Sequence, residues 1–387
     1  MKYFLGCLCM LAMTASAASE LRVATFNVSM EATNYVEQGS AVQGNELSRH
    51  LRTGKHPQIK NIAEIIQRVR PDIILLNEFD YLDSSNSDIQ AFLKNYLSSS
   101  QNKAGSIEYP YFYAAPVNTG VDSGLDLDKN GMTSGTKDDA FGFGFSPGHY
   151  GMLILSKYPI QKHQVRTFQT FLWKDMPDNL LETIKDENGQ AYYNEEAQKV
   201  LRLSSKSHWD IPIEINGHTL HVLASHPTPP VFDGPENRNG KRNHDEIRFW
   251  TDYLSSPEQS SYIYDDNDKY GGLSAKHFVI MGDLNASVDN GDADKAGIAG
   301  LLNHKRVNNR IKPISLGAIA HAPNNQHSAS HTAAWGMRAD YVLPSTTLNV
   351  TNSGVFWPKV DDPLQRLIKD RKSSSDHRLV WVDIKLK

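Results

Sequence analysis

An unbroken apolar run that ends in polar residues is the feature that most constrains how this chain can fold. Residues 278–285, FVIMGDLN, begin with four apolar residues and continue through Gly282 to Asp283 and Asn285. A run this apolar ahead of a glycine indicates a strand buried on both faces. Residues two apart on an extended chain point to the same side. Asp283 and Asn285 are therefore expected to emerge as a pair at the edge of a sheet.

Further apolar strands alternate with helices along the chain. A helix is predicted from Pro57 to just before Pro71, and a second around Ile247 and Trp250. Alternation from start to end, without an internal repeat, predicts an α/β fold in a single domain, placed at residues 18–387. The other predicted strands are residues 21–28, 72–79, 151–160, 218–227, 339–345 and 374–384.

The first 17 residues have the pattern of a segment removed after export. Lys2 precedes an apolar stretch that reaches Met13, and the small residues Ala15 and Ala17 follow. This order of charged, apolar and small residues is typical of a secretory signal peptide. The apolar stretch is shorter than the ~20 residues that a spanning helix needs. Residues 1–17 are therefore predicted to be a signal peptide of a secreted or periplasmic protein without stable membrane insertion.

The composition is that of an ordinary globular protein. The chain has 387 residues, 39% hydrophobic and 22% charged, with a net charge of −4. No global basic field points to a nucleic-acid or membrane partner. Both cysteines, Cys7 and Cys9, lie in the predicted signal peptide. The mature chain is thus expected to be a monomer without disulfides that depends on core burial.

Polar side chains stand at or beside most of the predicted strands. Each alone has an ordinary explanation, such as capping a turn or pairing with an arginine. Together they predict an oxygen-rich pocket with two histidines where strand ends converge. Mg²⁺ prefers carboxylate and carboxamide oxygens together with substrate phosphate, and histidines suit proton transfer or hydrogen bonding to phosphate. These residues are Asn27, Glu78, His226, Asp283, Asn285, Asp340, Asp376 and His377.

Other catalytic motifs are absent from the sequence. There is no HExxH or CxxC, which argues against a zinc peptidase or zinc ribbon. There is also no GxSxG or P-loop, which argues against a serine hydrolase or a nucleotide switch.

The ordered set TFN, LNEF, SHP, GDLN, RADYVL and SSDHRLV resembles the motifs of the endonuclease/exonuclease/phosphatase superfamily, deoxyribonuclease I-like phosphoesterases. The resemblance runs from about Leu21 to Ile384. It implies an α/β (α+β) fold of the four-layer αββα type, in which two packed mixed β-sheets are flanked by helices. It also implies a metal-dependent phosphoric ester hydrolase.

Carried over position by position, the resemblance implies a metal site. Glu78 would be the principal ligand, with Asn27 beside it and Asp376 facing the same site. The implied cofactor is Mg²⁺ or Mn²⁺.

The same resemblance implies the catalytic residues. Asp283 would be the general base that deprotonates water, and Asn285 would hold the phosphate or the attacking water. His226 and His377 would hydrogen-bond the phosphoryl oxygens, with Asp376 and Asp340 orienting them.

The long loop after His226 departs from the family pattern. It is rich in Pro, Asn and Arg, and leads into the predicted helix. Arg238, Lys241 and Arg242 are candidates for contact with substrate phosphate, with a solvated loop as the equally weighted alternative. Because loops at such a pocket set specificity, this one leaves the substrate class open.

A half calcium-binding motif lies in DLDKNG, residues 126–131. The spacing matches the first half of an EF-hand loop, but Lys137 stands where that loop requires glutamate, so an EF-hand is excluded. A looser Ca²⁺ site that uses Asp138 or Asp139, and a plain acidic turn, are both left open. The candidate ligands in the motif are Asp126, Asp128 and Asn130.

The sequence as a whole predicts an exported Mg²⁺- or Mn²⁺-dependent phosphoesterase that cleaves a phosphodiester or phosphomonoester by in-line attack of water. One alternative is an extracellular nuclease with nucleic acid as substrate. An alternative of another class is a non-catalytic calcium-binding protein on the same fold.

Overall fold

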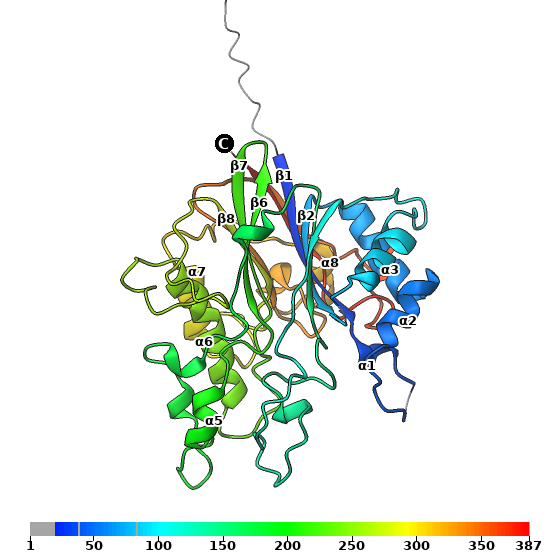
Figure 1. Ribbon diagram of the computed structural model, residues 1–387. Helices are drawn as coiled ribbons and strands as arrows, with labels where there is room; N and C mark the ends of the chain where they lie inside the picture. The colour runs from blue at the N-terminus through cyan, green and yellow to red at the C-terminus, as the bar shows by residue number, and fades with distance from the viewer. Residues whose placement is uncertain (1–19, 38, 83, 387) are drawn as a thin grey trace, which may run out of the picture.

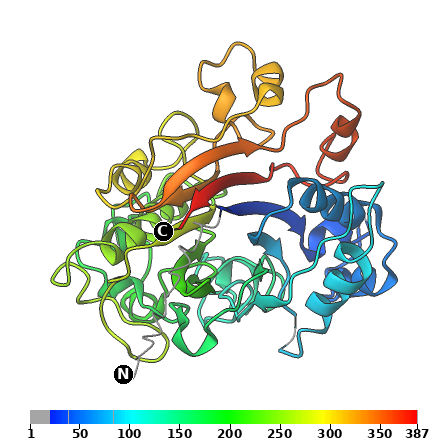
Figure 2. The same ribbon diagram turned by 90° about the horizontal axis from the view of Figure 1, so that it is seen from above.

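Two β-sheets packed face to face form the centre of the molecule (Figure 1). The computed structural model describes residues 20–37, 39–82 and 84–386, and the predicted signal peptide at residues 1–17 lies outside the described residues. The first sheet has the order β10-β11-β1-β2-β4-β3 and the second β5-β6-β7-β8-β9. Figure 2 shows β10, β11 and β1, in orange, red and blue, side by side.

The first sheet consists of β10 (Asn349–Val355), β11 (Val380–Lys385), β1 (Glu20–Met30), β2 (Ile73–Phe79), β4 (Met152–Ser156) and β3 (Tyr111–Tyr113). The second consists of β5 (Arg166–Thr167), β6 (His208–Ile215), β7 (His218–Ser225), β8 (Phe278–Asp283) and β9 (Asp340–Pro344). Parallel pairing of β1 with β2 and of β7 with β8 makes both sheets mixed, because the remaining pairs are antiparallel.

Side chains of β8 alternate between two hydrophobic clusters. Val279 and Met281 belong to the cluster that joins the two sheets, whereas Phe278 and Ile280 pack in a second cluster with Trp250. All four side chains of β8 named here are fully buried. The prediction of a strand buried on both faces is confirmed, since side chains of a strand point alternately to its two faces.

Helices cover the outer faces of the two sheets. Figure 1 shows α1, α2 and α3 beside the first sheet and α5, α6 and α7 beside the second. The helices are α1 (Ala32–Tyr35), α2 (Glu46–Thr53), α3 (Pro57–Val69), α4 (Ser87–Phe92), α5 (Glu195–Val200), α6 (Arg238–Tyr253), α7 (Lys295–Leu302) and α8 (Leu316–His321). The four-layer αββα arrangement is therefore confirmed. Within the described residues, no helix has the length and apolar character needed to cross a membrane.

Shorter helical turns lie in the connections. The 3₁₀ turns are Lys137–Asp139, Lys162–Gln164, Trp173–Asp175, Leu181–Thr183, Ser328–Ser330 and Pro363–Leu367, and Leu93–Leu97 is a π-helical turn that continues α4.

The helix predicted from Pro57 is α3, which starts at that residue and ends at Val69. Arg70 follows in the left-handed conformation (φ 55°) ahead of Pro71, so two local features end the helix. The sequence did not predict the short strands β3 and β5, nor β6 and β10. β6 follows a stretch without clear periodicity, and β10 is an edge strand with polar residues.

Strand direction determines where the functional side chains are placed. Because β1 runs parallel to β2, and β7 to β8, each pair brings its carboxyl ends to one edge of its sheet. β9 and β11 run antiparallel to β8 and β1, so their amino ends lie at the same edges. β1 and β2 contact β8 across the interface between the sheets. Residues at the carboxyl ends of β1, β2, β7 and β8 thus meet residues at the amino ends of β9 and β11.

Candidate active site

Asp283, the last residue of β8, is the centre of the site. Its side chain is 1% exposed, and its Oδ2 accepts a hydrogen bond from Asn27 Nδ2 at 3.0 Å. The same oxygen lies 3.4 Å from His226 Nε2 and 3.5 Å from His377 Nε2. Three of the residues that the sequence singled out therefore converge on one carboxylate oxygen of a fourth, Asp283.

Local contacts fix the orientation of Asp283. Its backbone N–H donates to Asn77 Oδ1 at 3.1 Å, and its Oδ1 accepts from the Asn285 N–H at 3.0 Å. The glycine of GDLN has a steric role, because a Cβ on Gly282 would lie 2.0 Å from the carbonyl oxygen of Ser225. Close approach of β7 and β8 at this point thus requires glycine.

Asn285 lies beside Asp283, as the sequence predicted from their spacing. Its backbone is in the left-handed region (φ 52°), and its Nδ2 donates to the carbonyl oxygen of Pro227 at 3.1 Å. This bond connects the end of β8 to the residue that follows His226.

His377 is held between two carboxylates. Its Nδ1 lies 2.9 Å from Asp340 Oδ2, which also accepts a hydrogen bond from Thr332 Oγ1 at 2.7 Å. Burial lowers the pKa of His377, but the charges of Asp340 and Asp283 outweigh it and raise the pKa to about 10. Burial also raises the pKa of Asp340 to about 6, against the opposing charge of His377. At neutral pH the pair is an imidazolium and a carboxylate.

His226 has the opposite tendency. Burial and the charge of Lys206 lower its pKa, although Asp283 acts to raise it. Its Nδ1 has no hydrogen-bond partner among the described residues. Burial alone would raise the pKa of Asp283, but His377, with His226 and Asn27, keeps it below its usual range. The centre therefore contains an ionised Asp283 between a protonated His377 and a neutral His226.

Glu78 lies at the first-sheet side of the site in a strained conformation. Its φ of 56° is uncommon for a residue other than glycine, and such outliers are often found at functional sites. Arg371 places one guanidinium nitrogen 3.5 Å from Glu78 Oε2 and 3.1 Å from Glu31 Oε1. The arginine pairing that the sequence could not exclude for Glu78 is thus present.

Three carboxylates surround the guanidinium of Arg371. Burial alone would lower its pKa, but the carboxylates raise it above its usual value; they are Glu78, Asp376 and Glu31. Asp376 also accepts a hydrogen bond from Ser29 Oγ at 3.3 Å. Carboxylate oxygens gathered around one positive charge are a donor set that suits a hard divalent cation. Glu78 and Asp376 thus both act on the cation Arg371, but among the described residues they do not form a group of three carboxylate or imidazole ligand atoms within 4.8 Å of one another, so their role as metal ligands stays a prediction.

A group of side chains with metal-ligand spacing lies around Asp283 itself. Ligand atoms of Asp283, Asp340 and His377 all lie within 4.8 Å of one another. Both ring nitrogens of His377 already face these carboxylates. Metal ligation by His377 would require the loss of one of these contacts, so we interpret this group as a hydrogen-bonded relay.

The basic residues predicted for the long loop lie in the first turns of α6, and their partners lie outside this helix. Arg238 pairs with Glu236 and lies 3.8 Å from Asp138, and Lys241 Nζ donates to the carbonyl oxygen of Thr183 at 2.8 Å. Arg242 donates to three backbone carbonyl oxygens. None of the three makes a hydrogen bond or ion pair with the described residues around Asp283.

The half calcium motif forms a compact acidic turn. Asp126 accepts hydrogen bonds from the N–H groups of Asn130 (3.1 Å) and Gly131 (2.9 Å). Carboxylate oxygens of Asp126, Asp128 and Asp139 lie within 4.8 Å of one another. Of the two aspartates left open by the sequence, Asp139 joins the group, whereas Asp138 lies beside Arg238.

Several residues in the site were not found from the sequence. Arg371 and Glu31 lie a few positions from the motif residues Asp376 and Asn27, which is the one signal that points to them. Asn77 belongs to the LNEF motif but was not singled out, and Lys206 and Thr332 carry no sequence signal, because they resemble ordinary polar residues in connections. These residues are Glu31, Asn77, Lys206, Thr332 and Arg371.

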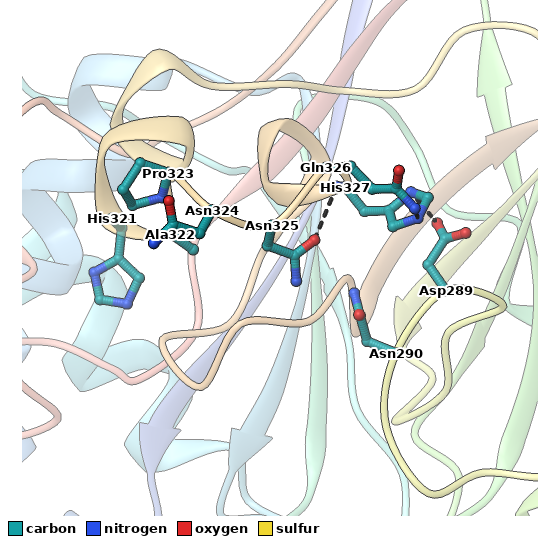
Figure 3. A pocket seen from close by; sticks show the side chains of 9 residues that line it. All are labelled: Asp289, Asn290, His321, Ala322, Pro323, Asn324, Asn325, Gln326 and His327. Carbon is teal, nitrogen blue, oxygen red and sulfur yellow. Dashed lines mark hydrogen bonds and ion pairs between the residues drawn. The ribbon is translucent and has the colours of Figure 1, made fainter.

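A polar cavity of about 800 Å³ lies away from the central carboxylate (Figure 3). It is lined by Asp289, Asn290 and residues 321–327, and none of the polar strand-end residues lines it. His327 Nδ1 lies 3.5 Å from Asp289 Oδ2, and its N–H donates to Asn325 Oδ1 at 2.8 Å.

The chain is similar to proteins of one known family. The model of the Endonuclease/Exonuclease/phosphatase family matches residues 24–377. No curated protein matches the chain.

Solved structures with a similar course of the chain include an endonuclease/exonuclease/phosphatase from Beutenbergia cavernae, with 15% identity, a TM-score of 0.49, and coverage of 95% of this chain and 72% of that chain. Sphingomyelinase C from Streptomyces griseocarneus has 13% identity, a TM-score of 0.46, and coverage of 94% and 99%. Beta toxin from Staphylococcus aureus with bound magnesium ions has 15% identity, a TM-score of 0.44, and coverage of 95% and 100%. These likenesses are too distant to carry an assignment, which rests on the family match. The chain belongs to the endonuclease/exonuclease/phosphatase family and is a metal-dependent phosphoester hydrolase.

Proposed function

We propose that the protein is an exported phosphoesterase that depends on Mg²⁺ or Mn²⁺ and hydrolyses a phosphodiester or phosphomonoester by in-line attack of water. The observation that carries this proposal is the convergence of Asn27, His226 and His377 on one oxygen of Asp283. A buried, ionised carboxylate between two imidazoles is suited to activating water and to binding an anionic phosphate.

Glu78 and Asp376 would hold the cation, with Asn27 beside them. Glu78 and Asp376 are among the carboxylates whose charge acts on Arg371, which supports a shared cation site. A bound divalent cation would neutralise the negative charge that develops on the phosphoryl group.

Asp283 would orient the attacking water and accept its proton. Its pKa lies below its usual range, so the carboxylate is fully ionised at neutral pH. Asn285, whose side chain is anchored to the Pro227 carbonyl, would hold the phosphate or the water. The fixed position of both groups reduces the entropy that must be lost when water and phosphate are aligned.

The two histidines would contact the phosphoryl oxygens in different protonation states. His377, whose pKa is about 10, donates from a positively charged ring, and Asp340 keeps that ring in place. His226, whose pKa is lowered, is neutral and can exchange a proton with Asp283 at 3.4 Å. His377 would therefore supply positive charge, and His226 would relay a proton.

We test the assignment with Asp283→Asn and Glu78→Gln. Asp283→Asn removes the proton acceptor and should reduce kcat by roughly 10²–10⁴-fold while metal binding persists. Glu78→Gln should weaken metal affinity, so that high Mn²⁺ restores part of the activity. The measurement is kcat across a metal titration on the best substrate among plasmid DNA, RNA, p-nitrophenyl phosphate, bis-p-nitrophenyl phosphate and sphingomyelin, with metal affinity from calorimetry.

Glu195→Gln on α5 is the matched control, because Glu195 is exposed and lies outside the site. It should behave like the parent protein in both measurements. Near-parental kcat in Asp283→Asn would rule out the proposed base.

Export is the second part of the proposal. Residues 1–17 have the order of a signal peptide, and residues 18–387 would then form a single catalytic domain. N-terminal sequencing of protein from the native cell should give a start close to Ala18 in material outside the cytoplasm. Recovery of intact Met1 in the cytosol would contradict export without affecting the catalytic assignment.

A further inference from the structure

Lys206 lies at the sheet edge that carries His226. Residues His208 of β6 and Ser225 of β7 pair in register. Lys206 lies two residues before the first of these, and His226 follows the second directly. Because β6 and β7 are antiparallel, both residues extend beyond the paired strands at the same end. The connection that precedes β6 therefore leads past the catalytic centre.

Glu246 of α6 fixes this connection beside the residues that follow His226. Its Oε1 accepts from the Ser205 N–H at 2.7 Å, and its Oε2 accepts from the Thr228 N–H at 2.6 Å. The carbonyl oxygen of Lys206 accepts from the Asn118 N–H at 2.9 Å. Both ends of the Glu246 carboxylate thus bind backbone donors, one next to Lys206 and the other two residues after His226.

The side chain of Lys206 is buried without a direct partner. It is 5% exposed, yet its Nζ makes no hydrogen bond or ion pair with any residue in the described part of the chain. Buried lysines are normally paired, because an ammonium is costly to remove from water. Lys206 Nζ is not among the described buried polar atoms that lack a partner, so the ammonium keeps contact with solvent and can bind an anionic ligand.

Electrostatic effects show which groups Lys206 faces. Its charge is the strongest of the charges that act on the pKa of His226. Burial lowers the pKa of Lys206 itself, whereas Glu246, Glu78 and Asp283 act to raise it. The ammonium is therefore within electrostatic reach of the proposed base and of the proposed metal ligand.

We propose that Lys206 is a further catalytic residue, whose ammonium donates hydrogen bonds to a non-bridging oxygen of the scissile phosphate on the side of His226. The inference rests on the proposed function, because it assumes a phosphate ester between Asp283 and Glu78. Lys206 forms no covalent bond and transfers no proton. It stabilises the charge that grows on the phosphoryl oxygens as water attacks. It also keeps His226 neutral, because a second positive charge beside it is unfavourable.

The first experiment compares Lys206→Met and Lys206→Arg with the parent protein. Removing one charged donor to a developing anion typically lowers kcat by about 10²–10³-fold, which we expect for Lys206→Met. Lys206→Arg retains the charge and should keep part of the activity. Mn²⁺ affinity by calorimetry should not weaken in either variant, because Lys206 is not a metal ligand. The matched control is Lys199→Met, since Lys199 is 70% exposed on α5.

The second experiment needs no destabilising substitution. Nitrogen-15 labelling of lysine in the parent protein lets the Lys206 Nζ signal be followed by NMR, with Lys206→Arg for its assignment. Inorganic phosphate should shift this signal and leave the Lys199 signal unchanged. An unshifted Lys206 signal at saturating phosphate would overturn the proposal, as would near-parental kcat in folded Lys206→Met.

The two proposals fail in distinguishable ways. If Asp283→Asn is inactive while Lys206→Met has parental kcat, only the role of Lys206 is wrong. If Asp283→Asn is active, the proposed base is wrong, and the phosphate-induced shift still decides whether Lys206 binds phosphate.

Discussion

At the scale of single residues, two histidines within 3.5 Å of the same carboxylate oxygen have opposite protonation states. His377 is flanked by Asp340 and Asp283, which raise its pKa to about 10. His226 is next to Lys206, whose positive charge lowers its pKa together with burial. The difference comes from neighbouring charges, because both imidazoles are buried and both contact Asp283.

Asp340→Asn should shift the alkaline limit of activity. The substitution removes one of the three carboxylate charges that raise the pKa of His377, so the imidazolium should lose its proton at a lower pH. Because the protonated form is the one proposed to act, kcat/KM should fall at a lower pH than in the parent protein, with kcat lower by roughly 10²-fold at neutral pH. The measurement is the pH profile of kcat/KM from pH 6 to 11.

The raised pKa of His377 also makes the stability of the fold depend on pH. A histidine with a raised pKa in the folded state stabilises the fold fully below its unfolded pKa of ~6.5, and this contribution is lost as pH rises through about 10.

Asp361→Asn, an exposed change, is the control for the pH profile of kcat/KM. An alkaline limit that stays in place in Asp340→Asn would show that His377 does not set it.

At the scale of elements, short connections position the site while strands and helices support it. The loop before β6 is attached through Glu246 to α6, and the ring of His208 donates from Nε2 to the Glu246 carbonyl oxygen at 2.8 Å. That ring also packs against Phe249 and Trp250. The β6–α6 contact thus stabilises the fold and holds Lys206 in place.

His208→Gln should reduce the sensitivity of the fold to acid. Burial lowers the pKa of His208 to about 4, so the unfolded chain takes up a proton below ~6.5 that the folded chain does not. The contribution of His208 to the free energy of unfolding is fully present above pH ~6.5 and is lost toward pH 4, by up to about 3 kcal/mol. Glutamine can keep a bond to the Glu246 carbonyl and does not titrate.

The measurement is the free energy of unfolding by denaturant from pH 4.5 to 7.5. The curve of His208→Gln should be flatter than that of the parent protein, whereas the exposed His163→Gln should follow the parent curve. Parallel curves for parent and His208→Gln would mean that the neutral ring does not contribute to acid sensitivity.

The acidic turn at residues 126–139 is an element with its own test. If Asp126, Asp128 and Asp139 bind Ca²⁺, the ion should raise Tm through mass action on the folded state. Replacing Asp126 and Asp128 by Ala should abolish this increment and leave Mg²⁺-dependent turnover largely unchanged. Thermal unfolding with Ca²⁺ and with chelator is the measurement, and the absence of any shift in the parent protein would favour a plain acidic turn.

At the scale of the whole molecule, the interface between the sheets assembles the site. Asn27 lies in the first sheet and Asp283 in the second, and their hydrogen bond joins positions 256 residues apart in the chain. Met281, two residues before Asp283, packs in the cluster shared by both sheets. The packing that holds the sheets together therefore also sets the separation of the catalytic groups.

Met281→Ala and Ile280→Ala should both destabilise the protein by about 2–5 kcal/mol, although their side chains face opposite sides of β8. Each leaves a cavity in a fully buried cluster. Denaturant unfolding gives the free energies, and Leu316→Ala on the exposed surface should lose far less. A loss below about 1 kcal/mol for either buried residue would contradict burial on both faces of β8.

The sequence by itself determined the features that depend on neighbouring residues. The apolar run of β8 defined a strand buried on both faces, and the two-residue spacing placed Asp283 and Asn285 together. Pro57 and Pro71 bounded α3. The family motifs in order implied the αββα sandwich. These features were readable because steric limits and side-chain periodicity act over a few residues.

Only the tertiary structure decided which groups surround the catalytic residues. Arg371 faces Glu78 from 293 positions away, and Lys206 approaches His226 from a connection with no recognisable motif. The tertiary structure also decided the protonation states of the histidines, because a pKa depends on burial and on charges that are close in space but distant in sequence. Strand pairing and sheet packing bring these charges together, and no local pattern in the chain records the result.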